Sequence, residues 1–157
     1  MPLSLRDATV ADGDLLLAWR NDPVARQSSF QKDEVDEASH RRWFAAKLDD
    51  RERTRIWIVT EEEVPVGQIR YERKDHVAEI SISVAASFRG RGFAAEILRV
   101  TAPRACREFG VHAVCGLVKL SNRASMAAFE RAGFGRGEDT IVNGDPAAVF
   151  VWKCERS

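Results

Sequence analysis

Residues 87–94 read Ser-Phe-Arg-Gly-Arg-Gly-Phe-Ala, and they follow the run Ile-Ser-Ile-Ser-Val at residues 80–84. A strand, a glycine-bearing loop and a helix in this order make a phosphate-binding site. Glycines let the backbone approach the ligand closely, and the free amides at the start of the helix point at the anion. The stretch therefore predicts that a phosphorylated ligand binds the loop formed by Arg89, Gly90, Arg91, Gly92, Phe93 and Ala94.

The spacing of these glycines excludes the two commonest phosphate loops. The chain has no Gly-x-x-x-x-Gly-Lys-Ser/Thr, and no Gly-x-Gly-x-x-Gly followed by an acidic residue about 20 positions later. We therefore expect neither ATP in a P-loop nor a dinucleotide in a Rossmann fold.

Composition narrows the class of protein further. The 157 residues are 45% hydrophobic and 31% charged, which is ordinary for a globular chain and predicts one domain over residues 1–157. Lys plus Arg and Asp plus Glu each total 24, so no global positive field attracts nucleic acid. No signal-peptide core or apolar run of membrane length is present. We expect neither nucleic acid nor membrane as a partner.

The three cysteines are an odd number without the spacing of metal ligands. They predict reduced thiols, no metal site and a cytoplasmic location.

Periodicity predicts alternating strands and helices. Strands are expected at 3–6, 56–60, 66–72, 78–84, 113–119, 140–142 and 147–153. Helices are expected between the Thr9–Asp12 cap and Pro23, and at 37–48, 93–109 and 123–132, with Pro103 kinking or dividing the third. Asn143-Gly144 signals a hairpin. The order predicts an α+β (mixed α/β) fold with a mostly antiparallel sheet of about seven strands and four helices.

Two motifs carry a family resemblance. Arg89, Gly92 and Ala94 match Gln/Arg-x-x-Gly-x-Gly/Ala, and the segment from Asn122 through Ser125 and Phe129 to Gly133-Phe134 begins about 33 residues after Arg89. Together they resemble the pyrophosphate loop and the Asn-x-x-(Ala/Ser)…Tyr-Glu-Lys-x-Gly-Phe segment of the GCN5-related N-acetyltransferase (GNAT) superfamily. The resemblance implies a GNAT-like fold whose fourth and fifth strands are splayed.

The resemblance also implies acetyl-CoA as co-substrate, with no metal. Its pantetheine arm would lie between the splayed strands and contact the backbone from Ile82 to Val84, with the Val84 amide near the thioester oxygen. The amides of the glycine loop would hold the pyrophosphate. Asn122 and Ser125 would contact the rest of CoA, although Asn122 also suits a helix cap and Ser125 an ordinary first-turn serine. Phe129 stands beside CoA where the family often has the tyrosine that protonates the departing thiolate.

The candidate base is Glu79, at the position where many relatives carry a glutamate that takes a proton through water. The alternative is a cross-strand ion-pair partner or a solvent-facing strand residue. Ser81 and Ser83 share its face by strand alternation. They relay protons, bind substrate hydroxyls or are plain polar positions.

For the amine acceptor, residues 19–23 (Trp-Arg-Asn-Asp-Pro) and 40–44 (His-Arg-Arg-Trp-Phe) resemble GNAT enzymes that acetylate the 4-amino group of UDP-linked aminodideoxy sugars in nonulosonic acid pathways. In that interpretation Arg20, Asn21 and His40 bind substrate. Arg20, His40 and Arg41 meet the diphosphate, and Trp19 or Trp43 stacks on uracil or sugar. Alternatively, the tryptophans anchor the core and the arginines form a solvated face.

Two other functions remain open. The first is a Nα-acetyltransferase of the kind that modifies ribosomal proteins, which shares the glycine loop and the pattern Ala78-Glu79-Ile80. The second is a noncatalytic acyl-CoA-binding module, which Phe129 suggests. A homodimer is also left open.

Overall fold

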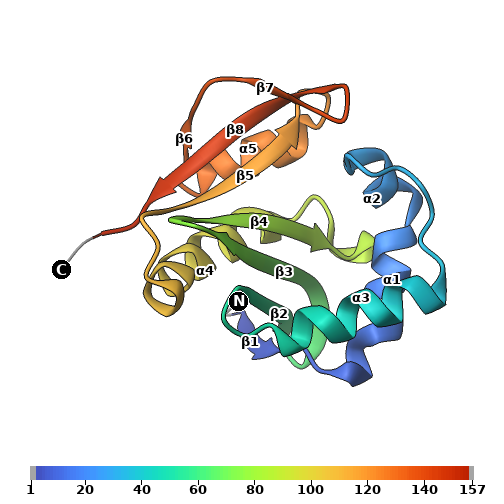
Figure 1. Ribbon diagram of the computed structural model, residues 1–157. Coiled ribbons are helices and arrows are strands. Elements are labelled where there is room, and N and C mark those ends of the chain that lie inside the picture. The colour runs from blue at the N-terminus through green and yellow to red at the C-terminus, as the bar shows by residue number, and fades with distance from the viewer. Residues whose placement is uncertain (1–2, 156–157) are drawn as a thin grey trace.

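The computed structural model describes residues 3–155 as one sheet with helices on both faces (Figure 1). The strands are β1 (Ser4–Asp7), β2 (Thr54–Glu61), β3 (Val64–Lys74), β4 (Val77–Val84), β5 (Ala113–Lys119), β6 (Gly135–Arg136), β7 (Thr140–Val142) and β8 (Asp145–Lys153). The helices are α1 (Gly13–Asn21), α2 (Pro23–Ser28), α3 (Glu37–Asp49), α4 (Phe93–Phe109) and α5 (Arg123–Arg131), with short 3-10 turns η1 (Val10–Asp12) and η2 (Ala86–Phe88).

The sheet is mostly antiparallel. Its strand order is β1-β2-β3-β4-β5-β8-β6, with β7 paired to β8, and only the β4–β5 pair is parallel among the described strands. Helices α4 and α5 cover one face, where Trp57, Ile69, Leu98 and Phe150 belong to the main core. Helices α1 and α3 cover the β2 side of the other face, where Leu16 and Phe44 pack on Ile56 and Ile58. The predicted fold class is confirmed.

Strands β4 and β5 pair over four residues and then separate. Val77–Ile80 lies beside Ala113–Gly116, and the pairing ends there. At this point the ring of Phe129 packs against β5. A Cβ added to Gly116 would lie 2.4 Å from the Phe129 Cζ, so only glycine allows this approach. The expected splay of the fourth and fifth strands is therefore present, and it begins at Gly116.

Helix α2 and strand β6 were not predicted, so the expected four helices and seven strands become five and eight within residues 3–155. Asp22 caps α2 by accepting a hydrogen bond from the Ala25 amide, and Pro23 is its first residue. Asp-Pro therefore begins a helix here as well as ending α1. Of the two outcomes expected at Pro103, a kink or a division, the division does not occur, because α4 runs unbroken from Phe93 to Phe109.

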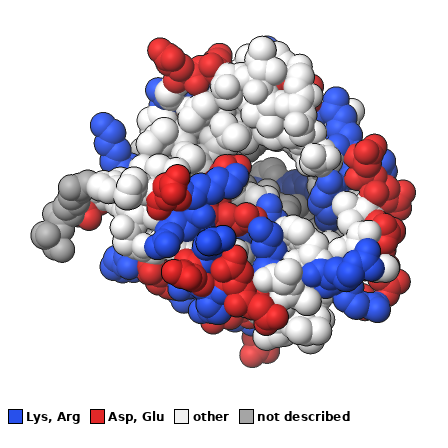
Figure 2. Space-filling view, in the orientation of Figure 1, with Lys and Arg blue, Asp and Glu red and all other residues white. Residues whose placement is uncertain are grey.

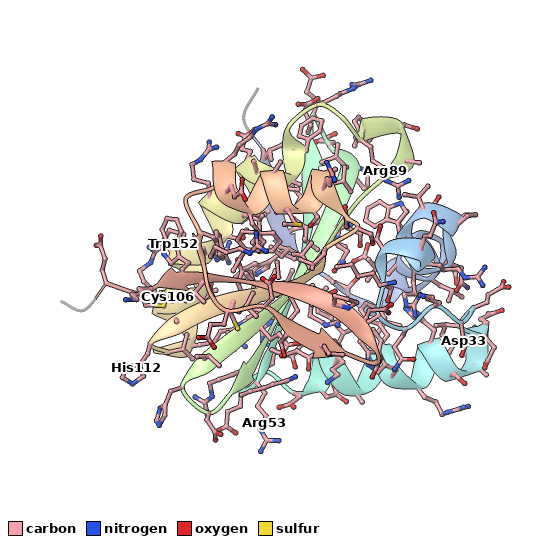
Figure 3. All side chains as sticks on the ribbon, turned by 90° about the horizontal axis from the view of Figure 1, so that it is seen from above. Asp33, Arg53, Arg89, Cys106, His112 and Trp152 are labelled. Atoms are coloured by element: carbon pink, nitrogen blue, oxygen red, sulfur yellow. A yellow bond between two sulfur atoms is a disulfide. The ribbon has the colours of Figure 1, made fainter. Side chains whose placement is uncertain are left out.

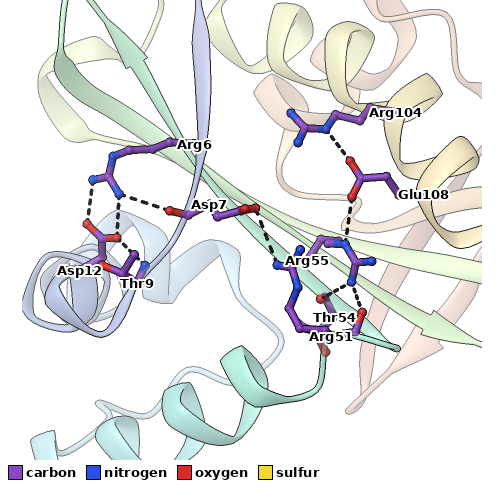
Figure 4. A network of polar contacts seen from close by, with 9 residues as sticks. All are labelled: Arg6, Asp7, Thr9, Asp12, Arg51, Thr54, Arg55, Arg104 and Glu108. Atoms are coloured by element: carbon purple, nitrogen blue, oxygen red, sulfur yellow. Dashed lines mark hydrogen bonds and ion pairs between the residues drawn. The ribbon is translucent and has the colours of Figure 1, made fainter.

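A polar network fixes β1 and the edge of β2 (Figure 4). The Arg6 guanidinium donates two hydrogen bonds of 2.8 Å to the Asp12 carboxylate, which also accepts the Thr9 amide. On the other side of β2, Glu108 of α4 accepts hydrogen bonds from Arg55 at 3.0 Å and Arg104 at 2.6 Å. The first set of contacts joins β1 to the turn η1, and the second joins β2 to the last turns of α4.

The expectation of three reduced thiols is wrong for two of them. Cys106 in α4 and Cys154 after β8 form a disulfide, with their Cα atoms 5.6 Å apart although 48 positions separate them in the chain. Only the fold brings them together, at the end of the sheet opposite Arg89 (Figure 3). Cys115 is free. Disulfides persist mainly in oxidising compartments, so the cysteine-based argument for a cytoplasmic location fails.

Within residues 3–155, none of the helices has the length and apolar character needed to cross a bilayer.

Reduction of the Cys106–Cys154 bond is expected to lower the free energy of unfolding by about 2–4 kcal/mol, because the bond closes a long loop in the unfolded chain. Urea denaturation of Cys106→Ser/Cys154→Ser measures this. Cys115→Ser is the matched control and should unfold at nearly the wild-type urea concentration. Equal midpoints for all three proteins would contradict the prediction.

Candidate functional site

The free edge of β4 begins where β5 leaves it. The Ala85 amide donates to the Val66 carbonyl at 2.8 Å, so residue 85 directs its backbone groups toward β3. Because antiparallel strands alternate, Ile82 and Val84 direct theirs to the opposite side, into the space that β5 has vacated. This edge can hydrogen-bond an extended ligand as an added strand would. The structure thus places Ile82 and Val84 at the splayed edge, and their contact with a pantetheine arm stays a prediction.

The glycine loop follows this edge. Gly90 and Gly92 have φ angles of 79° and 81°, in the left-handed region that favours glycine, and neither has another atom within 4 Å of a built Cβ. Gly92 caps α4, and Phe93 and Ala94 open the helix without a capping side chain. The first-turn amides are therefore available to an anion, and α4 is long enough for its dipole to help. Arg91 is exposed, with its guanidinium over the Phe88 ring.

The Arg89 side chain is held by residues outside the glycine loop. Its guanidinium pairs with the Asp22 carboxylate at 3.0 Å and donates to the Val84 carbonyl at 3.1 Å. The Ala25 amide, and to a lesser extent Arg89, hold the pKa of Asp22 below its ordinary value. Figure 3 shows Arg89 beside the first helices of the chain. Arg89 therefore fastens the loop to α2.

Asn122 and Ser125 are joined at the start of α5. The Asn122 Oδ1 accepts the Ser125 amide at 3.2 Å, so Asn122 is the helix cap that the sequence allowed. Phe129 lies one turn further on and is 2% exposed, between Gly116, Phe134 and a stacked Phe150. Its ring is part of the hydrophobic core beside the point where β5 separates from β4.

Glu79, Ser81 and Ser83 occupy one face of β4, as alternation predicts. Their cross-strand neighbours on β3 are Glu72, Arg70 and Gln68 respectively. Gln68 donates its Nε2–H to the Ser83 Oγ at 2.8 Å, and Lys74 pairs with Glu79 at 2.8 Å. The ion-pair interpretation of Glu79 is therefore realised in the structure.

A pocket of about 210 Å³ lies over this face and is lined by Arg70, Glu72, Lys74, Glu79, Ile80 and Ser81. Glu79 precedes Val84 by five residues, which is roughly 16 Å along an extended strand. A proton from a ligand at Val84 could reach Glu79 only through water or through Ser81 and Ser83.

Two arginines and a histidine, Arg20, Arg70 and His40, lie on the same face of the sheet. Arg20 donates to the Gln31 carbonyl at 2.7 Å, while its Nη1 is shielded from solvent and has no hydrogen-bond partner among the described residues. Burial, and to a lesser degree Arg26, lower the pKa of Arg20. Burial, with a smaller effect of Arg20, also lowers the pKa of His40, so His40 is neutral at pH 7. Arg70 pairs with Glu72 at 2.7 Å.

The other predicted acceptor residues have structural partners. The Asn21 amide exchanges two hydrogen bonds of 2.8 Å with the Val35 backbone and so fixes the loop before α3. Trp19 packs on the small core that contains Phe44, which agrees with its interpretation as a core anchor. Trp43 is 38% exposed, and the Arg70 guanidinium lies 4.8 Å from its ring.

Three polar residues of this region were not predicted: Gln68, Arg70 and Lys119. Each lies on the face of the sheet opposite α4. Strand alternation could have placed Gln68 and Arg70 on one face, but only the register shows that they lie beside Ser83 and Ser81. Figure 2 shows a hollow between the part formed by β5 and β8 and the part formed by β4 and the first helices, with charged residues around it.

Comparison with known proteins agrees with this architecture. Residues 3–135 match the model of the acetyltransferase (GNAT) domain family. The chain is 30% identical over 142 residues to an L-methionine sulfoximine/L-methionine sulfone acetyltransferase of Pseudomonas paraeruginosa, covering 85% of this chain and 81% of that one. The corresponding Pseudomonas aeruginosa protein is 30% identical over 144 residues, with the same coverage.

Solved structures show the same fold at low identity. The aminoglycoside acetyltransferase AAC(6')-Ib with ribostamycin and coenzyme A has a TM-score of 0.82 at 19% identity, covering 98% of this chain and 94% of that one. The spermidine N-acetyltransferase of Vibrio cholerae with CoA and spermine has 0.85 at 16%, covering 96% and 95%. RimL, a ribosomal L7/L12 alpha-N-protein acetyltransferase, in complex with CoA, has 0.81 at 17%, covering 97% and 94%.

Gly92→Glu is expected to lower acetyl-CoA affinity by about a hundredfold or more, because a carboxylate placed beside the pyrophosphate repels it. Calorimetric titration with acetyl-CoA measures the affinity. Gly110→Glu is the matched control, since Gly110 also has a positive φ of 65° and open space around it but lies at the other end of α4. Equal affinities of the two variants would refute the placement of the loop.

Proposed function

Since this chain belongs to the GNAT acetyltransferase family and is an acetyl-CoA-dependent N-acetyltransferase, we propose that its acceptor is a small molecule with a primary amine and an anionic group. The observation that carries the proposal is the buried, unpartnered Nη1 of Arg20 among the described residues, close to His40 and Arg70. A buried donor without a partner is costly, and a carboxylate or phosphate would satisfy it.

The donor site follows from the strand edge and the loop. In this proposal the amides of Arg89, Gly90, Arg91, Gly92, Phe93 and Ala94 hold the pyrophosphate, and the backbone of Ile82 and Val84 holds the pantetheine arm. Asn122 and Ser125 contact CoA at the start of α5. The Val84 amide donates to the thioester oxygen and stabilises the charge that develops on it.

The reaction needs a neutral amine. Its nitrogen attacks the thioester carbon, the N–C bond forms and the C–S bond breaks. Glu79 receives the amine proton through water, with Ser81 and Ser83 lying between Glu79 and the thioester along β4. Phe129 has no hydroxyl to donate, so the CoA thiolate leaves without a proton from that position and takes one from water.

An α-amino acid derivative is the acceptor that the relatives favour. The names of the two curated relatives specify L-methionine sulfoximine and L-methionine sulfone, each with a carboxylate beside its amine. A UDP-linked 4-amino sugar is the second candidate. Arg20 suits its diphosphate as a cation, whereas His40, being neutral, could only donate a ring N–H to it. The resemblance of residues 19–23 and 40–44 supports this candidate, although Trp19 and Asn21 have structural partners.

Turnover assays separate these functions. Acetyl-CoA consumption is measured with L-methionine sulfone, with a UDP-4-amino sugar and with a short peptide bearing a free N-terminal amine. Preference for either anionic small molecule supports the proposal. Preference for the peptide indicates the Nα-acetyltransferase. Acetyl-CoA binding without turnover of any amine would fit a noncatalytic module and contradict the proposal.

Arg20→Met is expected to raise KM for the anionic amine at least about tenfold, since it removes one partner of a buried charge pair. KM for acetyl-CoA should be unchanged. Arg42→Met removes the same charge from the exposed side of α3 and serves as control. Equal acceptor KM values for Arg20→Met and wild type would remove Arg20 from the site.

Glu79→Gln is expected to lower kcat mainly below the pKa of the acceptor amine, where proton removal limits the rate. Above that pKa the variant should approach the wild type. Lys74→Met breaks the same ion pair but keeps the carboxylate, and should retain the wild-type pH profile. If Glu79→Gln lowers kcat equally at every pH, Glu79 is not the base.

A further inference from the structure

Helix α2 is anchored to both of the strands that separate. At its start, Asp22 pairs with Arg89, which also binds the Val84 carbonyl at the end of β4. At its other end, the Gln27 carbonyl accepts a hydrogen bond of 3.0 Å from the Lys119 Nζ at the end of β5. Helix α2 therefore spans the opening between β4 and β5 on the face of the sheet opposite α4 (Figure 1).

Lys119 is an unusual residue for this place. It is only 5% exposed, and a lysine is almost never buried unless its charge has a partner. Besides the Gln27 carbonyl, its ammonium lies 3.7 Å from an Asp145 carboxylate oxygen and 5.9 Å from the centre of the Phe30 ring. The buried charge is thus directed at the segment after α2 and at β8.

The segment after α2 also reaches the β7–β8 hairpin directly. Asn143 in the turn donates its Nδ2–H to the Phe30 carbonyl at 3.3 Å, and Lys32 lies 3.8 Å from Asp145. Between segment and hairpin lies a pocket of about 460 Å³, lined by Phe30, Gln31, Lys32, Asp33, Asn143, Gly144 and Asp145. Segment 27–33 thus lies across the splay and ends against the opposite half of the sheet.

We propose that Lys119 determines acceptor size by holding segment 27–33 across the splay, so that small amines reach the thioester and polypeptide N-termini do not. A peptide acceptor extends beyond its amine and needs an open groove, whereas a small molecule fits behind the segment. The inference rests on the proposed acetyl transfer to a small amine. It assigns Lys119 a specificity role and no proton transfer.

The test compares Lys119→Met with Lys119→Arg. Methionine fills the buried space without a charge, whereas arginine can still donate to the Gln27 carbonyl. Hydrogen exchange measures how often segment 27–33 opens. The segment should exchange about tenfold faster in Lys119→Met, because a hydrogen bond from a charged donor is lost. Lys119→Arg should stay close to wild type.

Acceptor choice is the second readout. The ratio of kcat/KM for the short peptide to kcat/KM for L-methionine sulfone should rise in Lys119→Met and remain low in Lys119→Arg. The affinity for acetyl-CoA should be the same in all three proteins. Asn143→Ala/Lys32→Ala changes only surface contacts of the segment, and should shift both readouts in the same direction even if Lys119→Met folds poorly.

Each failure has a separate meaning. If segment 27–33 exchanges at the wild-type rate in Lys119→Met, the role of Lys119 is overturned, whatever the activity. Faster exchange with an unchanged acceptor ratio overturns the control of acceptor size. If the wild type acetylates neither L-methionine sulfone nor a UDP-4-amino sugar, the proposed function fails.

Discussion

The constraint on which this structure depends is the short parallel pairing of β4 with β5. Four residues of each strand pair, and the strands then separate at Gly116, against which Phe129 is packed. The separation leaves the backbone groups of Ile82 and Val84 that face away from β3 without a partner strand. A backbone edge of this kind is costly if buried without partners, and it binds an extended ligand readily. The proposed donor site is thus a gap in the sheet.

Such a gap weakens the sheet, because few backbone contacts join its two halves. Contacts outside the sheet connect them again at both ends. At the closed end, the Cys106–Cys154 bond joins α4 to the chain after β8. At the open end, α2 is held by Arg89 from one half and by Lys119 from the other. The halves are therefore fixed at each end, while the middle of the gap remains free for a ligand.

The sequence predicted the parts of the fold that local patterns determine. The helix at 93–109 and the strands at 113–119 and 140–142 have the expected bounds, since glycine caps and alternation mark them. Local patterns could not show that Cys106 meets Cys154, or that Lys119 meets Gln27, because these contacts join distant segments. The backbone geometry of the glycine loop could be predicted, because the positive φ angles of Gly90 and Gly92 follow from the residue type; its role as a binding site stays a prediction. The partners of Arg89 and Asn21 depend on packing and were missed.

Phe129 shows how packing and chemistry compete at one position. The ring lies between Gly116, Phe134 and Phe150, and is 2% exposed. A buried tyrosine hydroxyl needs a hydrogen-bond partner, and these neighbours offer aromatic rings and a glycine. Phenylalanine therefore suits the core that keeps β5 away from β4, and the general acid is absent from this position. A thiolate is a tolerable leaving group, so a well-positioned thioester reduces the need for an acid. In the proposed mechanism, the geometry of the splay therefore matters more than a proton donor at position 129.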